Sequence, residues 1–281
     1  MSFSFDRFEL KFVITPLQRE RLMPSILPHV RADENASETA YYPIVSLYYD
    51  NAARDCYWQK VRSWPSRRKM RVRVYGSLDG TLPPTSFMEI KHKHMGKIIK
   101  RRARVPLEMA LAVGQGDALD GVHLPENDRR VVEEARRLVE HDGFQPACCM
   151  RYDRYAYTDK NPESDLRITF DTDIAYRFHD LTPRPDDRRF EKYLLPEGYS
   201  VLEVKVSSTV PYWLSKAIGA IGCVIQSHSK YCNAVEDGDP VLHEQIGGRK
   251  TLQYGTVPPL ADMGREVVKH CFDKPRIAEA S

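Results

Sequence analysis

The chain has 281 residues, of which 42% are hydrophobic and 29% are charged, and its formal net charge is +3 at pH 7. This composition is typical of a soluble globular protein and excludes an intrinsically disordered chain. A net charge of +3 is too weak to indicate nucleic-acid binding, so no nucleic-acid partner is expected. No apolar run approaches the roughly 18 to 20 residues that a transmembrane helix needs.

The compartment is predicted from the N-terminus and the cysteines. The first residues lack the basic start and apolar stretch of a signal peptide. The six cysteines form no C-x-x-C pair and show no zinc-ligand spacing. Thiols that serve as small core residues are typical of a reducing compartment, so a cytoplasmic location is expected.

The predicted elements begin with a strand at residues 7–11 and a helix from Pro16, which follows a Thr15 cap. Further strands are predicted at residues 41–50, 69–73, 87–93, 97–106, 147–158, 166–173 and 201–206. Helices are predicted at residues 57–62, 107–120, 128–141, 211–221 and 262–272. Residues 1–237 are expected to form one domain and residues 238–281 a C-terminal appendage, because the pattern weakens after Gly238.

Six short extended segments place charged residues at alternate positions with apolar residues between them. Side chains at positions i, i+2 and i+4 of a strand lie on one face, so each segment carries a charged stripe. Cations outnumber carboxylates on these stripes far more than in the whole chain. The charged positions are Arg7, Glu9, Lys11, Lys69, Arg71, Arg73, Glu89, Lys91, Lys93, Lys100, Arg102, Arg104, Arg167, Asp171, Glu203 and Lys205.

Two interpretations of the stripes are open. Polar and apolar alternation usually means a solvated sheet face over a one-sided core. Six stripes with the same cation-rich face favour a shared interior instead. The predicted fold is therefore α+β, with an antiparallel β-barrel or tunnel, closed or nearly closed, whose helices pack on the outside. A wide lumen lined by lysine and arginine stays wet, whereas a packed core could not contain such a face.

The stripes also indicate a chemistry. Lysine and arginine only donate hydrogen bonds, and the arginine fork matches phosphate oxygens, so the interior is suited to a polyanion. Carboxylates beside phosphates would be repelled unless a divalent cation lies between them. Glu9, Glu89 and Glu203 are therefore candidate ligands of Mg²⁺ or Mn²⁺. The alternative is that each glutamate neutralises the lysine two residues further on.

Several pieces of the chain resemble the polyphosphate polymerase (VTC) domain within the triphosphate tunnel metalloenzymes of the CYTH-like superfamily. They occur in the family's order across residues 5–237. The pieces are Arg7-Phe-Glu9-Leu-Lys11-Phe, Ser46-Leu-Tyr48-Tyr-Asp50, Arg71-Val-Arg73 with Tyr75-Gly76, Phe87-Met-Glu89-Ile-Lys91, Arg151-Tyr152-x-Arg154-x-Ala156-Tyr157, Arg167-x-Thr169-x-Asp171, Leu202-Glu203-Val-Lys205 and Ser229-Lys230-Tyr231.

The resemblance implies an antiparallel β tunnel that transfers the γ-phosphoryl group of ATP to a growing polyphosphate chain. It implies phosphate-binding catalytic roles for Lys11, Arg71, Arg73, Lys91, Arg151, Arg167, Lys205 and Lys230. Glu203 would hold the metal, with Glu9 and Glu89 as further candidates. Additional substrate-binding residues are expected at Arg7, Lys69, Lys93, Lys100, Arg102, Arg104, Arg154 and Ser229.

The expected partners are ATP and inorganic polyphosphate, and a membrane-protein partner stays open. Neither the SPX module nor the transmembrane segments of the eukaryotic complexes that the chain resembles are expected within these 281 residues. A triphosphatase that uses water as the acceptor and a non-catalytic polyphosphate-binding module are the alternatives. His228, beside Ser229 and Lys230, is expected to pack or to be exposed, and a catalytic role is the less favoured interpretation.

Overall fold

A computed structural model of the protein describes residues 8–34, 36, 39–76, 85–117, 123–184, 187–190 and 192–246. The strands are β1 (Phe8–Ile14), β2 (Val30–Ala32), β3 (Tyr41–Asp50), β4 (Ser66–Tyr75), β5 (Thr85–His94), β6 (Lys97–Pro106), β7 (Gln145–Asp159), β8 (Arg167–Arg177), β9 (Lys192–Tyr193) and β10 (Ser200–Val206). The helices are α1 (Pro16–Ile26), α2 (Asp55–Val61), α3 (Leu107–Gln115), α4 (Glu126–Glu140), α5 (Tyr212–Ala220), α6 (Lys230–Gly238) and α7 (Pro240–Gln245). The predicted helix at residues 262–272 lies outside the described residues.

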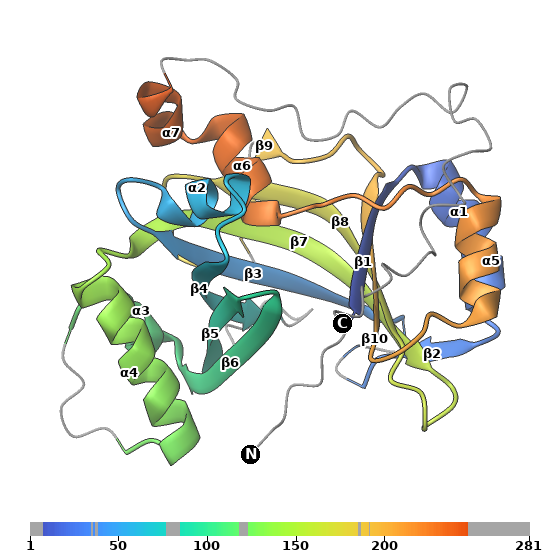
Figure 1. Ribbon diagram of the computed structural model, residues 1–281, viewed down its shortest axis with the longest axis horizontal. Coiled ribbons are helices and arrows are strands. Elements are labelled where there is room, and N and C mark those ends of the chain that lie inside the picture. Colours follow the sequence, from blue (N-terminus) through green and yellow to red (C-terminus); the bar gives the residue numbers. More distant parts are fainter. Residues whose placement is uncertain are drawn as a thin grey trace, which may run out of the picture.

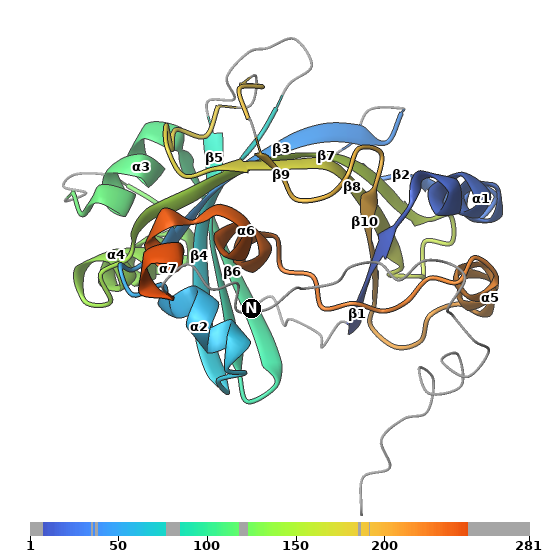
Figure 2. The ribbon, with the colours of Figure 1, turned by 90° about the horizontal axis from the view of Figure 1, so that it is seen from above.

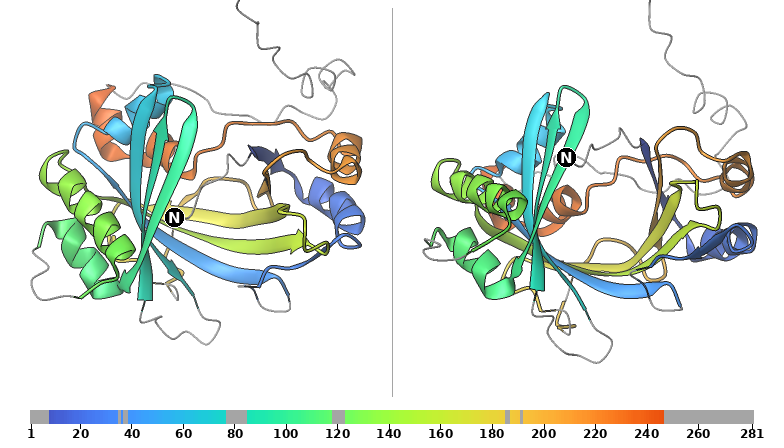
Figure 3. Two further views of the ribbon diagram at one scale, coloured as in Figure 1. Left: turned by 60° about the horizontal axis from the view of Figure 1, so that its bottom comes forward. Right: turned by 90° about the horizontal axis from the view of Figure 1, so that it is seen from below.

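The strands form one antiparallel sheet in the order β1-β10-β8-β7-β3-β4-β5-β6, with β2 added to β7 and β9 added to β8. The sheet curls strongly, so that β4, β5 and β6 stand steeply against β3, β7 and β8 (Figure 3). Figure 1 shows β1 and β10 rising on the opposite side of the curve. The predicted α+β fold of tunnel type is confirmed, although no hydrogen-bonded pairing joins β1 to β6 among the described strands.

Two apolar layers cover the convex side of the sheet. The helices α3 and α4 pack on the β4–β6 part through Val113, Val132 and Leu138, which are buried with Met88 and Ile90. The helices α1 and α5 cover β1, β10 and β8 at the other end. The apolar residues between the charged positions of each strand therefore face outward into these layers, as strand alternation requires.

The start of α1 follows from its sequence. The Thr15 hydroxyl accepts a hydrogen bond from the Gln18 amide at 3.1 Å, and the Gln18 side chain accepts one from the Thr15 amide at 3.0 Å. This reciprocal pair satisfies two backbone donors that a helix leaves free at its N-terminus. The predicted Thr15 cap is confirmed.

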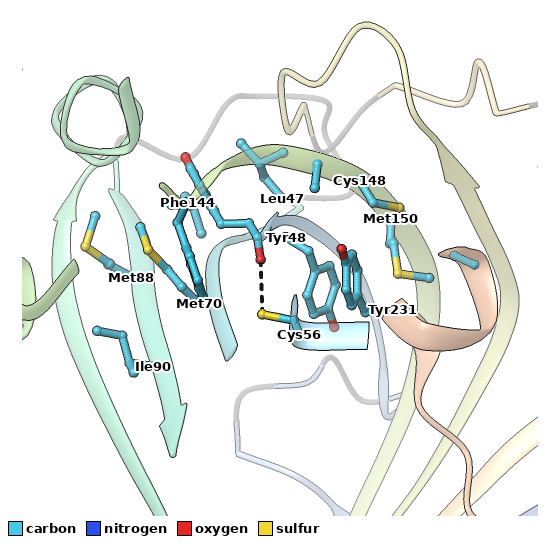
Figure 4. Packing of buried hydrophobic residues seen from close by; sticks show 14 of the residues in the cluster. Leu47, Tyr48, Cys56, Met70, Met88, Ile90, Phe144, Cys148, Met150 and Tyr231 are labelled. Atoms are coloured by element: carbon cyan, nitrogen blue, oxygen red, sulfur yellow. Dashed lines mark hydrogen bonds between the residues drawn. The ribbon is translucent and has the colours of Figure 1, made fainter. Parts of the chain in front are cut away.

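Helix α6 differs from the others because it lies within the curve of the sheet (Figure 2). The Tyr231 ring stacks on the Tyr48 ring of β3, with 5.4 Å between centroids (Figure 4). The Tyr231 hydroxyl also donates a 2.7 Å hydrogen bond to Asp50. This contact places the N-terminal end of α6 over the concave face.

Residues 225–229, which we call the strap, carry the chain from α5 outside the sheet to α6 inside it. At one end the Gln226 amide donates to the Lys11 carbonyl of β1 at 2.8 Å. Beyond it, Lys60 of α2 donates to the Ser227 hydroxyl at 3.0 Å, and Lys69 of β4 donates to the Ser229 hydroxyl at 3.1 Å. The strap therefore joins β1 to the β4 side across the open part of the curve.

The segment predicted as an appendage begins with packed structure. Asp239 is fully buried and forms a bidentate ion pair with Arg54. Leu242 of α7 is also buried in the core beside α2 and α6. The domain boundary after residue 237 stays a prediction. Within the described part of the chain, no helix is both long and apolar enough to cross a bilayer.

Replacing Gly114 by alanine should destabilise the protein. Gly114 of α3 lies against Tyr49, and an added Cβ would lie 2.6 Å from Tyr49 Cε1, well inside van der Waals contact. Overpacking of this kind costs about 1–3 kcal/mol in the free energy of unfolding. Chemical denaturation measures it.

Gly219 of α5 supplies the matched control. An added Cβ there would have no atom within 4 Å. Alanine in a helix is more stable than glycine by roughly 0.5–1 kcal/mol, so Gly219→Ala should leave stability equal or higher. Equal effects of the two substitutions would contradict the close packing of α3 on β3.

Candidate functional site

Strand alternation gathers the charged stripes on the concave face. The register pairs Arg71 with Glu89 and Glu89 with Arg102, and directly opposed residues of an antiparallel pair share a face. The cations on this face come from seven strands and α6. They are Lys11, Lys69, Arg71, Arg73, Lys91, Lys93, Lys100, Arg102, Arg104, Arg154, Arg167, Lys205 and Lys230.

Glu9 of β1 and Glu203 of β10 share two lysines. Lys11 lies 3.1 Å from Glu203 and 3.5 Å from Glu9. Lys205 lies 2.9 Å from Glu203 and 3.3 Å from Glu9. The two carboxylates and the two ammonium groups therefore form one compact ionic group on adjacent strands.

Helix α6 adds a third lysine to this group. Lys230, the first residue of α6, lies 2.5 Å from Asp171 of β8 and 3.5 Å from Glu203. Asp171 also accepts hydrogen bonds from two nitrogens of the Arg154 guanidinium, Nε at 2.6 Å and Nη2 at 2.8 Å. We call Glu9, Glu203 and Asp171 the carboxylate cluster.

Glu89 forms the centre of a second ionic group on the opposite wall. Arg71 and Arg102 each approach its carboxylate to 2.6 Å, and Lys100 approaches it to 2.8 Å. Arg73 lies 3.9 Å away. One buried carboxylate on β5 therefore holds cationic side chains of both neighbouring strands, β4 and β6, in a fixed arrangement.

Hydroxyl groups orient the arginines of β4. Arg71 donates to the Tyr48 hydroxyl at 3.1 Å. Arg73 donates to the Ser46 hydroxyl at 3.2 Å and to the Tyr152 hydroxyl at 2.9 Å. Such neutral partners fix a guanidinium without neutralising it, so the charge of Arg73, which lies 3.9 Å from Glu89, stays available to an anion.

The two walls approach each other across the interior. Lys91 of β5 lies 3.7 Å from Glu9 of β1, although these strands lie near opposite ends of the sheet order. With the strap, this ion pair encloses the concave face as a passage. Its lining is strongly cationic and holds carboxylates at two places.

The sequence of the chain matches the family model described as VTC domain over residues 6–237. The chain belongs to the VTC domain family. This membership, together with the cationic passage, indicates a role in phosphate transfer or polyphosphate handling.

No curated protein matches the chain. Among solved structures, the chain is similar to a Bacillus halodurans protein provisionally described as an adenylate cyclase. Sequence identity is 7% and the TM-score is 0.40, with 90% of this chain and 97% of that chain covered. This likeness is too distant to support an argument about function.

The charges of this VTC domain shift the pKa values of its carboxylates. Burial raises the pKa of Glu203, but Lys205, Lys11 and Lys230 together hold it well below its usual range. Burial likewise raises the pKa of Glu89, and Arg71 with its neighbouring cations outweighs it. Both groups are therefore ionised at neutral pH.

Lys100 shows the opposite effect. Burial and the neighbouring cations Arg71 and Arg102 lower its pKa to about 7, against the attraction of Glu89. Its charge is therefore the most easily lost of the cations around Glu89, and an added anion would favour its protonated form.

The three carboxylates predicted as metal ligands differ in how their surroundings would suit a metal. No group of three or more histidine, cysteine or acidic side chains suited to a metal occurs among the described residues. Glu9 and Glu203 nevertheless fit a divalent ion held jointly with substrate, because Mg²⁺ often takes one or two carboxylates plus phosphate oxygens. Glu89 does not fit, since Arg71, Arg102 and Lys100 already surround its carboxylate.

Arg151, which was predicted to bind phosphate, lies on the convex face of the sheet. Arg151 pairs with Val45 of β3 and Ala175 of β8, which lie in an apolar cluster on the convex side. Its side chain donates to Asp153 at 2.9 Å. The prediction of an interior position for Arg151 is therefore wrong, and its near neighbour Arg154 points inward instead.

A β-bulge in β8 changes which of its residues face the interior. The register shifts opposite Arg151 and Asp153, and Asp173 adopts φ 49°. An extra residue reverses the alternation, so Asp171 and, beyond the bulge, Tyr176 both face inward. Arg167 lies at the far end of the concave face, 2.9 Å from Asp33 and 3.1 Å from the Tyr42 hydroxyl. Arg7 lies outside the described residues.

Sequence reasoning missed the hydroxyl partners of the arginines. Ser46 and Tyr48 were part of the family resemblance but had no assigned role. Their signal was the alternation itself, because they lie two residues apart opposite Arg73 and Arg71. Tyr152 lies two residues from Arg154 and therefore on the same face of β7. The assignment of Arg151 to the interior put Tyr152 on the opposite face.

Replacing Glu89 by glutamine should lower the free energy of unfolding at pH 7 by roughly 2–3 kcal/mol, because charged hydrogen bonds are lost. The folded pKa of Glu89 lies below its unfolded value of 4.5. Its contribution is thus present above about pH 4.5 and disappears as pH falls further. The difference in the free energy of unfolding between wild type and variant should therefore become smaller from about pH 5 to about pH 3, as chemical denaturation at these two pH values measures.

Glu126→Gln is the control, since Glu126 pairs with Arg129 and Arg130 on the exposed face of α4. This substitution should leave the free energy of unfolding unchanged at both pH values. A Glu89 variant as stable as wild type at pH 7 would contradict the structural role of this ionic group.

Proposed function

We propose that this chain is a metal-dependent polyphosphate polymerase that transfers the γ-phosphoryl group of ATP to a growing polyphosphate chain. The observation that carries the proposal is the extended cationic lining, which has cations on β1, β10, β8 and β7 and, beyond β3, on β4, β5 and β6. A lining of this extent offers contacts to many phosphates along a chain. Membership in the VTC domain family supports it.

The transfer would rely on positioning and charge. Phosphoryl transfer proceeds in line and gains most from groups that orient the reactants and neutralise the oxygens. Arg71 and Arg73 have the fixed geometry for this role because hydroxyl groups orient them. Lys11, Lys205 and Lys230 would bind phosphates on the opposite wall. No covalent enzyme intermediate is required.

A divalent metal would be held by Glu203 and Glu9 together with phosphate oxygens. When bound, Mn²⁺ or Mg²⁺ would neutralise phosphate charge and orient the reacting group. Both carboxylates are ionised at neutral pH because the surrounding lysines lower their pKa values. They are therefore in the form that binds a metal.

A triphosphatase is the second candidate. The Lys91–Glu9 ion pair crosses the interior at 3.7 Å, and this narrowing favours a short substrate over a long one. The same cations would then bind tripolyphosphate or a nucleoside triphosphate, and water would accept the phosphoryl group. A non-catalytic module would bind polyphosphate tightly without a metal requirement.

Incubation with ATP and Mn²⁺ tests the proposal directly. The protein should release ADP and build a long, phosphatase-sensitive polymer, which gel electrophoresis resolves. Glu203→Gln should abolish the metal-dependent reaction, whereas Glu134→Gln, on the convex helix α4, should retain it. Free phosphate as the only product, with tripolyphosphate as the better substrate, would establish the triphosphatase instead.

Replacing Arg71 by alanine should weaken tripolyphosphate binding about tenfold or more, since charged hydrogen bonds contribute about 1.5–3 kcal/mol. Isothermal titration calorimetry measures the loss. Arg101 is the matched control, because its fork binds Glu134 of α4 at 2.6 Å on the convex side. If Arg101→Ala weakens binding as much as Arg71→Ala, binding does not occur on the concave face.

A further inference from the structure

The strap carries one buried polar side chain that the proposed chemistry has not used. His228 is 8% exposed and lies two residues beyond Gln226, whose amide binds Lys11. Ser229 and Lys230 follow it and contact Lys69 and Asp171 respectively. The two residues that follow His228 thus contact side chains of the concave face.

Only one nitrogen of the His228 ring has a partner. The Asn233 side-chain nitrogen lies 3.1 Å from Nδ1. An amide nitrogen can only donate, so Nδ1 accepts and the hydrogen of the neutral ring is on Nε2. Nε2 is buried and has no hydrogen-bond partner among the described residues.

The ring is neutral in this environment. Burial, together with the nearby cations Lys230 and Lys11, lowers the pKa of His228 to about 3 against the attraction of Glu203 and Asp171. The same charges show that the ring lies within the field of the carboxylate cluster. His228 therefore presents a neutral N–H donor where the surrounding donors are cationic.

An unpartnered buried donor costs stability, about 1–3 kcal/mol for a polar group that has left water. Buried polar groups in folded proteins are nearly always satisfied, and each exception requires an explanation, of which a bound ligand is one. An apolar side chain at this position would not carry this cost. The orphaned Nε2–H thus requires an acceptor that the protein chain itself does not provide.

We propose that His228 is a phosphate-binding residue, donating its Nε2–H to a phosphate oxygen held between the strap, Lys230 and Lys11. The inference rests on the proposed binding of phosphates in the passage and adds a neutral donor to it. A neutral donor orients an oxygen without the water shell of an ammonium group. Asn233 is then a positioning residue, which fixes the ring tautomer.

The test compares binding and stability in the same variants. His228→Phe removes the donor and keeps a ring, so it should weaken tripolyphosphate binding about tenfold by calorimetry. The Tm of the protein without ligand should stay equal or rise, because the orphaned group is gone. His228→Gln, whose amide nitrogen can reach the position of Nε2, should restore most of the affinity. If the phenylalanine variant does not fold, His228→Asn replaces it, since that amide is too short.

His243 of α7 is the matched control. Its Nε2 lies 3.1 Å from the Glu236 carbonyl, so this histidine already has a partner within the protein. His243→Phe should lower the Tm and leave tripolyphosphate affinity unchanged. The opposite signs at the two positions separate a binding role from a structural one.

Two results would overturn the inference, and they differ in what else they exclude. Wild-type affinity in His228→Phe, with Arg71→Ala still impaired, would reject His228 as a ligand and leave phosphate binding intact. Absence of tripolyphosphate binding in the wild-type protein would reject both the inference and the proposed function. A lower Tm together with a weaker affinity for tripolyphosphate in every His228 variant, including His228→Gln, would assign the residue a packing role.

Discussion

Crowding many cations on one face of a sheet is the constraint on which the rest of this structure depends. Like charges at such spacing repel each other, and burial adds a further cost for each ion. The chain meets this cost by distributing carboxylates among the cations. Glu89 offsets part of the positive charge of one wall and the carboxylate cluster part of that of the other, so that the concave face remains folded while its excess charge stays positive.

The separation of the two faces follows from this constraint. Stability comes from the convex side, where apolar residues between the charged positions pack under α3 and α4 at one end and under α1 and α5 at the other. The concave side can then be arranged for chemistry rather than for packing. Its unsatisfied groups, above all Nε2 of His228, are tolerated because the convex layers hold the strands in place.

Much of this arrangement could be predicted from alternation alone. Period-two patterning fixes which side chains share a face, and the stripes of β4, β5, β6 and β10 lie as the sequence indicates. Arg151 was assigned to the interior from the family resemblance, although it lies three residues from Arg154 and regular alternation along β7 therefore puts the two on opposite faces. Alternation does not reveal ion pairing between distant strands. Glu89 has the same sequence context as Glu203, a lysine two residues on, yet the fold surrounds it with arginines.

The strap was beyond sequence reasoning for a different reason. Its contacts join β1, α2 and β4, which are far apart in the chain, and nothing in residues 225–229 is periodic. Lys230 was expected in the interior only because the family resemblance implied it. The route by which it reaches Asp171, across the edge of β1 and beside Tyr48, is a property of the folded chain.

The pairing of cations with carboxylates also bears on why a metal would be needed. In the unliganded protein Lys11 and Lys205 are bound to Glu9 and Glu203. A phosphate chain that enters the passage competes for these lysines and leaves the carboxylates facing anionic oxygens. That contact is unfavourable unless a divalent cation lies between the two anions. On the Glu89 wall the cations are numerous enough to bind both the carboxylate and a phosphate. The two walls would therefore differ in function, one requiring a metal with its phosphates and the other binding them through arginine and lysine alone.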